Sequence, residues 1–265
     1  MAYTENLTVP QPRDWQVLIK PALAQTNHRP WPMPTGPPVL FQRWVNLAFL
    51  HWPVPAARLR PLVPASLAIQ EFDGTSWVGI VPFEIQDLCA PLSTWTPLAF
   101  RELNVRLYVE ADGKPGVWFV SLDASSALAV MGARAAFRLP YFRARMAMAA
   151  DGTAIGFSSR RVRVPGIEFR GRYQSTGEEY EAAPGTLDHF LVERYCLYTR
   201  WHGGRILPLD IQHPPWRISP GRVDIDICTM ASMQGIALDA ADPPLVHFSR
   251  RQDTVSWRPA AIGAR

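Results

Sequence analysis

The segment from residue 103 to residue 123 contains the pattern that most restricts the fold of this chain. In the run LNVRLYVE, apolar side chains occupy every second position, and mainly polar ones lie between them. A period of two is typical of a β-strand with one buried face. The turn sequence ADGKPG follows and leads into VWFVSL, a second strand-forming run. The segment therefore predicts an antiparallel hairpin.

Further strand-forming runs occupy much of the remaining chain. They are VLFQRWVNLAFLHW (39–52), SWVGIVPFEI (76–85), RARMAMAA (143–150), TAIGFSSRRVRV (153–164), RILPLDIQ (205–212), RVDIDICTM (222–230) and PLVHFSRRQDTVSW (244–257). The Asp151-Gly152 pair lies between two of these runs and predicts a second hairpin.

Only three segments favour helices. VPAARLRPLVPASL (54–67) predicts a short helix between prolines, and SSALAVMGARAAFR (125–138) predicts a serine-capped helix ended by Pro140. GTLDHFLVERYCLYTR (185–200) has the clearest amphipathic pattern and Thr186 as its cap. Hairpins with so few helices argue for an α+β, mainly β protein whose antiparallel sheet is closed or nearly closed on itself.

The chain shows one compositional boundary, near its N-terminus. Residues 1–38 include NHRPWPMPTGPP, whose prolines disfavour a long helix or a central strand. We expect an irregular, proline-rich arm over residues 1–38. No flexible linker divides the rest, so residues 39–265 are expected to form a single domain.

Several function classes have no support in the sequence. The net charge of +4 comes from scattered arginines, and no run interleaves basic with aromatic residues as a nucleic-acid groove would. Dinucleotide, P-loop, zinc-protease and serine-hydrolase motifs are absent. Three distant cysteines and six scattered histidines lack ligand spacing, so neither a metal nor another cofactor is expected. A leader-like start and an apolar membrane span are also lacking, and we expect a cytoplasmic protein.

Four long segments resemble the YqjF-like proteins, a family of unknown function in the acetoacetate decarboxylase-like superfamily. They are FQRWVNLAFLHWPVPAARLRPLVPASL, FRELNVRLYV, PGVWFVSLDASSALAVMGARAAFRLPYF and FLVERYCLYT, within roughly residues 30–220. The resemblance implies a conical antiparallel β-barrel with a few flanking helices and an internal pocket.

The resemblance also implies positions for site residues. The decarboxylases have a G-R-E-x-x-x-aromatic-P-K-K segment, in which the first lysine forms a Schiff base and the second lowers its pKa. That segment corresponds here to ARAAFRLPYF, so Arg134 and the proline agree while Tyr141 and Phe142 replace the two lysines. The glutamate of the decarboxylase site falls on Glu102, and a site arginine falls close to Arg43.

The loss of both lysines argues against decarboxylation through an imine. The only lysines are Lys20, in the arm, and Lys114, at a turn tip where its ammonium group is expected to be hydrated. Tyr141 can instead donate a hydrogen bond or a proton to a bound oxygen, or it can be a buried aromatic residue with its hydroxyl bonded to backbone.

The other candidates each have a structural alternative. Glu102 acts in the site or forms an ion pair with Arg106, which lies on the same side of the strand. Arg134 reaches the pocket or joins the helix to the sheet. His51, next to Trp52, is a base or a core histidine.

Two further places carry charged or titratable groups of open role. Glu193 and Arg194 interrupt an apolar stripe, so they are expected to pair with a strand arginine or with a ligand. His213 lies in a proline-braced loop that is either a lid or simply rigid.

Two functions of different class follow. In the first, the chain is a lyase, hydratase or isomerase that uses no Schiff base, with catalytic Tyr141, Glu102 and Arg134. In the second, it binds a ligand without catalysis. In both, the partner is a small acidic or oxo compound, with no nucleic acid and no membrane, and a homo-oligomer is compatible with the sequence. The residues expected to bind this ligand are Arg43, His51, Trp52, Arg106 and Phe142.

Overall fold

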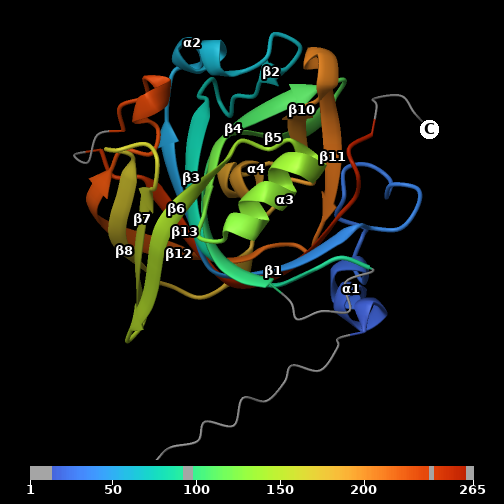
Figure 1. Ribbon diagram of the computed structural model, residues 1–265, viewed down its shortest axis with the longest axis horizontal. Coiled ribbons are helices and arrows are strands. Elements are labelled where there is room, and N and C mark those ends of the chain that lie inside the picture. The colour runs from blue at the N-terminus through green and yellow to red at the C-terminus, as the bar shows by residue number, and fades with distance from the viewer. Residues whose placement is uncertain (1–13, 92–97, 239–241, 261–265) are drawn as a thin grey trace, which may run out of the picture.

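The computed structural model describes residues 14–91, 98–238 and 242–260, and strands account for about half of them (Figure 1). The strands are β1 (Leu40–Pro53), β2 (Ala68–Ile69), β3 (Trp77–Cys89), β4 (Leu98–Ala111), β5 (Lys114–Ala124), β6 (Tyr141–Asp151), β7 (Ala154–Arg161), β8 (Glu168–Ser175), β9 (Tyr180–Glu181), β10 (Cys196–Arg200), β11 (Ile206–Gln212), β12 (Arg217–Cys228) and β13 (Leu245–Ser256). The mainly β class is confirmed.

The described residues also form four α-helices and three short 3₁₀ helices, all but α1 between strands. They are α1 (Trp15–Leu23), α2 (Ala56–Leu59), α3 (Ala127–Phe137) and α4 (Leu187–Val192), with η1 (Arg60–Leu62), η2 (His202–Gly204) and η3 (Ser232–Gln234). None of the helices in the described ranges has the length and apolar character needed to span a bilayer.

The sheet closes on itself. Its strand order is β2-β4-β3-β1-β13-β11-β10-β5-β6-β7-β8-β12-β9, and an additional pairing joins β4 to β5. The strands β4, β3, β1, β13, β11, β10 and β5 therefore form a closed ring. A second pairing, β13 with β12, also closes the outer strands β6, β7, β8 and β12 against this ring. In Figure 1, α3 and α4 are seen within the outline of the strands of the closed ring.

The predicted hairpin over residues 103–123 is confirmed as β4 and β5. The two strands pair from Glu102 opposite Ala124 to Ala111 opposite Lys114. The two residues of the turn, Asp112 and Gly113, have φ values of 50° and 71°. Positive φ at both positions matches the right-handed twist of paired strands and favours this Asp-Gly sequence.

The two faces of β4 enter different environments. Leu103, Val105, Leu107 and Val109 belong to a core cluster shared with residues of α2, β7 and β8. The intervening polar positions Glu102, Asn104 and Arg106 line an internal cavity. Both faces are therefore buried, whereas the alternation predicted one buried face.

Two strand pairs depart from the antiparallel arrangement of the rest of the sheet. Strand β5 pairs in parallel with β10 and with β6. Parallel neighbours need a crossover connection, and α3 supplies it between β5 and β6. The α3 helix begins after Ser126, whose hydroxyl accepts a hydrogen bond from the Ala129 amide, and it ends at Phe137 as the sequence predicts.

Two helix expectations need correction. The predicted helix over residues 185–200 ends at Val192, and its second half is strand β10. All four residues from Cys196 to Thr199 are buried, and a short apolar run of this kind does not distinguish a helix from a fully buried strand. In the expected irregular arm, residues 15–23 form α1, capped by Asp14. The first 13 residues of the arm lie outside the described residues.

Gly116 permits a close approach of β5 to β10. A Cβ atom placed on Gly116 would lie 2.8 Å from Cε2 of Tyr198 and 2.9 Å from the carbonyl oxygen of Cys196. We expect Gly116→Ala to lower the free energy of unfolding by about 1–3 kcal/mol, because β5 and β10 must move apart locally to admit the methyl group. Urea unfolding followed by circular dichroism measures this.

The matched control is Gly132→Ala in α3, where an added Cβ meets no atom within 4 Å. Alanine should leave stability unchanged or raise it by up to about 1 kcal/mol, because it favours a helix over glycine. Equal effects of the two substitutions would contradict a special constraint at the β5–β10 contact.

Candidate functional site

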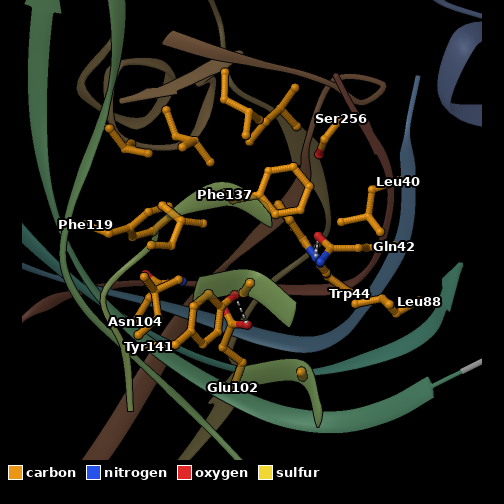
Figure 2. Close-up of a pocket in the computed structure, with 18 of the residues that line it drawn as sticks. Leu40, Gln42, Trp44, Leu88, Glu102, Asn104, Phe119, Phe137, Tyr141 and Ser256 are labelled. Atoms are coloured by element: carbon orange, nitrogen blue, oxygen red, sulfur yellow. Dashed lines mark hydrogen bonds between the residues drawn. The ribbon is translucent and has the colours of Figure 1, made fainter. Parts of the chain in front are cut away.

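A cavity of about 730 Å³ lies inside the ring of seven strands. Residues from β1, β3, β4, β5, β10, β11 and α3 line it, and Figure 2 shows part of this lining. Most of the wall is aromatic or aliphatic, including Trp44, Phe49, Phe83, Phe119, Phe137 and Trp216. A cavity of this size and character accommodates a small organic molecule.

Three polar side chains lie together on the cavity wall. The Tyr141 hydroxyl donates to Oε2 of Glu102 at 2.7 Å, and Figure 2 shows the two side chains facing each other. The Asn104 side chain lies close enough to Glu102 to favour its carboxylate form. Glu102 and Asn104 are two residues apart on β4, so both point inward. Tyr141 is brought to them because it begins β6 opposite Leu122 of β5.

Burial determines the protonation of this group. Glu102 is only 3 % exposed, and this burial is the main reason why its pKa rises from 4.5 to about 8. The hydrogen bond from Tyr141 and the nearby Asn104 side chain oppose the rise, because they favour the carboxylate. The pKa of Tyr141 lies well above 10, first because of burial and then because of the nearby Glu102. At pH 7, Glu102 is therefore mainly a neutral acid that holds a transferable proton.

A positively charged group lines the same cavity. Arg106 donates from Nε to the Tyr108 hydroxyl at 3.1 Å and from Nη2 to the Leu191 carbonyl oxygen at 3.0 Å. Its guanidinium carbon lies 4.9 Å from the ring centroid of Phe49. His51 supports this arrangement through Nε2, which lies 2.6 Å from the Tyr108 hydroxyl oxygen. Arg106 is thus a fixed cation, suited to an anionic ligand group.

The predicted ion pair between Glu102 and Arg106 does not form. Both residues are described and both line the cavity, but no ion pair joins them, and their hydrogen bonds go to other partners. Glu102 instead accepts a hydrogen bond from the Tyr141 hydroxyl.

Arg134 and Phe142 lie outside the cavity wall. Arg134 donates from Nε to the carbonyl oxygen of Tyr141 at 2.7 Å, and so joins α3 to β6. Of the two roles expected for Arg134, the structure therefore shows the link between helix and sheet and not a place in the pocket. The ring of Phe142 packs on the guanidinium group of Arg161, at 3.9 Å from ring centroid to Cζ. Phe142 follows Tyr141 directly on a strand, so its side chain points to the opposite face.

The remaining predicted ligand-binding residues also lie outside the cavity wall. Arg43 bonds to Asp253 at 2.8 Å and to Asp87. His51 is fully buried, and burial lowers its pKa well below 6.5, so it is a neutral core histidine. Trp52 belongs to the core, where its indole donates to the Asp242 carbonyl oxygen at 2.9 Å. Of the predicted ligand-binding set, only Arg106 lines the cavity.

Arg194, His213 and Asn104 also line the cavity. The sequence marked Arg194 and His213 as groups of open role, and burial lowers the pKa of His213. Asn104 was missed as a site residue. The available signal was its position between Glu102 and Arg106 on the same face of one strand.

Neither lysine reaches the cavity wall. Lys20 lies exposed on α1, and Lys114 forms an ion pair with Asp210 at 2.8 Å, so the expected hydrated ammonium is in fact paired. Across the part of the chain that the structure describes, no three His, Cys, Asp or Glu side chains cluster as a metal site would require.

Comparison with known proteins gives a family and a fold. The model of the family DUF2071, described as an uncharacterized conserved protein, matches residues 41–253. The uncharacterized protein YqjF of Bacillus subtilis (strain 168) is 38% identical over 227 residues, which cover 85% of this chain and 93% of that protein.

The similar solved structures share the fold at low identity. The enduracididine biosynthesis enzyme MppR complexed with pyruvate matches with a TM-score of 0.60 and 12% identity, over 86% of this chain and 91% of that chain. An acetoacetate decarboxylase-like enzyme from Sphingomonas wittichii RW1 matches with a TM-score of 0.56 and 12% identity, over 86% and 94%. The acetoacetate decarboxylase of Legionella pneumophila has a TM-score of 0.56 and 13% identity, over 89% and 93%. The fold is therefore acetoacetate decarboxylase-like.

The raised pKa of Glu102 should appear in the pH dependence of stability. A carboxyl whose pKa is higher in the folded protein stabilises the fold at low pH and loses this contribution as pH rises through that value. Between pH 4.5 and 8, the wild type should therefore lose stability relative to Glu102→Gln, on the order of a few kcal/mol. Urea unfolding at a series of pH values measures the difference. The exposed Glu181→Gln keeps Glu102, so its stability should follow that of the wild type at every pH. Parallel curves for wild type and Glu102→Gln would contradict the raised pKa.

The hydrogen bond from Tyr141 should be measurable through its partner. This bond favours the charged form of Glu102, so Tyr141→Phe should raise the pKa of Glu102 above about 8. The pH midpoint of the protonated-carboxyl infrared band, identified by its loss in Glu102→Gln, reports that pKa. A midpoint that is unchanged or lower in Tyr141→Phe would show that the hydroxyl does not stabilise the carboxylate.

Proposed function

The chain belongs to the DUF2071 family of uncharacterized conserved proteins, and we propose that it is an enzyme acting on a small oxo acid by acid–base catalysis without an imine. One observation carries this proposal: a buried, mainly neutral Glu102 bonded to the Tyr141 hydroxyl on the wall of an internal cavity. Enzymes often tune a carboxyl in this way so that it can give up a proton near neutral pH.

The chemistry needs only the groups present. Glu102 gives its proton to the carbonyl oxygen of the ligand and becomes a carboxylate. The hydrogen bond from Tyr141 and the nearby Asn104 side chain stabilise that carboxylate. The carboxylate then removes a proton from the carbon next to the former carbonyl group, which yields an enol and regenerates the acid. Isomerisation, loss of a leaving group or addition of water can follow, so the reaction class is isomerase, lyase or hydratase.

The ligand class follows from the cavity wall. Arg106 supplies a fixed positive charge for a carboxylate, and the aromatic lining favours an apolar substituent. The structural relative MppR was solved with pyruvate, an oxo acid, which supports this class of ligand for a cavity of the same fold. A Schiff base is excluded from the proposal, because neither Lys20 nor Lys114 lines the cavity.

A non-catalytic ligand-binding function is the second candidate. The mostly apolar wall of the cavity favours it, because such a wall binds organic molecules without further chemistry. The two candidates differ in whether a bound ligand exchanges its protons.

A two-step experiment tests both. A thermal-shift screen of small oxo and carboxylic acids identifies ligands, because a ligand that binds the native state raises its melting temperature. Proton exchange next to the carbonyl group of each hit is then followed by NMR in D₂O. We expect exchange by the wild type and a loss of about 100-fold or more in Glu102→Gln. The exchange rate should fall as pH rises through about 8, since the proton donor is then lost.

Glu181→Gln, on the exposed strand β9, is the control and should exchange like the wild type. Binding without exchange would select the non-catalytic function. A covalent adduct trapped by borohydride would contradict the absence of an imine, and no hit in the screen would contradict an oxo-acid ligand.

A further inference from the structure

The ring of strands has a gap on one edge of β5. Strand β10 pairs with β5 at Val117 and Trp118, and β6 pairs with it from Leu122 to Ala124. No strand pairs with residues 119–121 on that edge, within the described part of the chain. Phe119 lies in this gap, where it borders both the internal cavity and a second cleft of about 520 Å³.

Three arginines line the second cleft. They are Arg134 from α3, Arg138 from the turn after α3 and Arg200 from the end of β10. No aspartate or glutamate lines this cleft, and none of the three forms an ion pair with any described residue. Some exposed arginines have such partners, as Arg170 does with Asp226 at 2.9 Å, while others such as Arg145 and Arg160 have none among the described residues, so it is the gathering of three in one cleft that sets this place apart.

The backbone holds Arg138 at this place in a disfavoured conformation. Arg138 ends α3 in the left-handed region, with φ of 53°, which is unusual for a residue other than glycine or asparagine. Its guanidinium carbon lies 5.5 Å from the ring centroid of Trp201, and its Nη2 lies 2.5 Å from Nε2 of His202. The side chain is therefore positioned by aromatic partners that carry no negative charge.

An unused acceptor lies in the same cleft. Oε1 of Gln234 is buried and has no hydrogen-bond partner, although buried polar atoms are normally paired. An oxyanion oxygen is itself an acceptor and cannot bond to this atom, so the three arginines alone would bind an oxyanion in this cleft.

We infer that this cleft is a binding site for a small, multiply charged oxyanion, a phosphate ester or a polycarboxylate. Arginine suits either group, because its planar guanidinium donates two parallel hydrogen bonds to carboxylate or phosphate oxygens. An oxyanion would also relieve the repulsion among the three like charges. The site is separate from Glu102 and Tyr141 and does not depend on their chemistry, although Phe119 and Leu139 border both spaces.

Isothermal titration calorimetry of the full chain with pyrophosphate and, separately, with citrate tests this inference. We expect saturable binding of at least one probe, weakened about tenfold or more in the double variant Arg138→Gln with Arg200→Gln. Arg134 is left intact because it also holds the Tyr141 carbonyl. Arg200→Gln alone, at an exposed position, should weaken binding in part and serves if the double variant fails to fold.

The control double variant is Arg145→Gln with Arg160→Gln. These two exposed arginines face each other across β6 and β7 and line neither space, so the control removes the same charge. It should bind within about twofold of wild type, and so should Glu102→Gln. Equal weakening in both double variants, or no saturable binding of either probe, would overturn the inference. Binding of pyrophosphate alone would identify a phosphate site, and binding of citrate alone a carboxylate site.

Discussion

The hydrogen bonding of β4 along both edges is the constraint on which the rest of the structure depends. One edge pairs with β3 and the other with β5, and the second pairing closes the ring. Closure gives β4 an inside and an outside. Its apolar positions therefore face a packed core, while Glu102, Asn104 and Arg106 face a cavity with a mainly apolar wall, in which a charged group is poorly solvated. The raised pKa of Glu102 follows from this topology.

The sequence predicted the elements of the fold better than their partners. Alternation and the Asp-Gly turns specified the two hairpins, and Ser126 and Pro140 specified α3. The parallel pairs of β5 are non-local and leave no pattern in the chain. The strand from Cys196 to Arg200 was mistaken for helix, because burial on both faces removes the period of two that identifies a strand.

The candidate site shows the same division. The resemblance to the decarboxylases identified Tyr141 and Glu102 as candidates, and the structure places the Tyr141 hydroxyl oxygen 2.7 Å from Oε2 of Glu102. The resemblance could not exclude Phe142 from the ligand-binding residues. Two adjacent strand residues point to opposite faces, and an alignment does not show which of them faces inward. Arg43 was misplaced for a different reason: its partners Asp87 and Asp253 are distant in sequence and became visible only in three dimensions.

Phe119 and Leu139 form a common wall between the cavity and the arginine cleft. Any occupant that displaces either side chain alters the shape of the neighbouring space. Two occupants that both require such a displacement would be coupled through this wall, and the coupling free energy would be identical in both directions. The gap in strand pairing at residues 119–121 is what leaves the side chain of Phe119 between the two spaces.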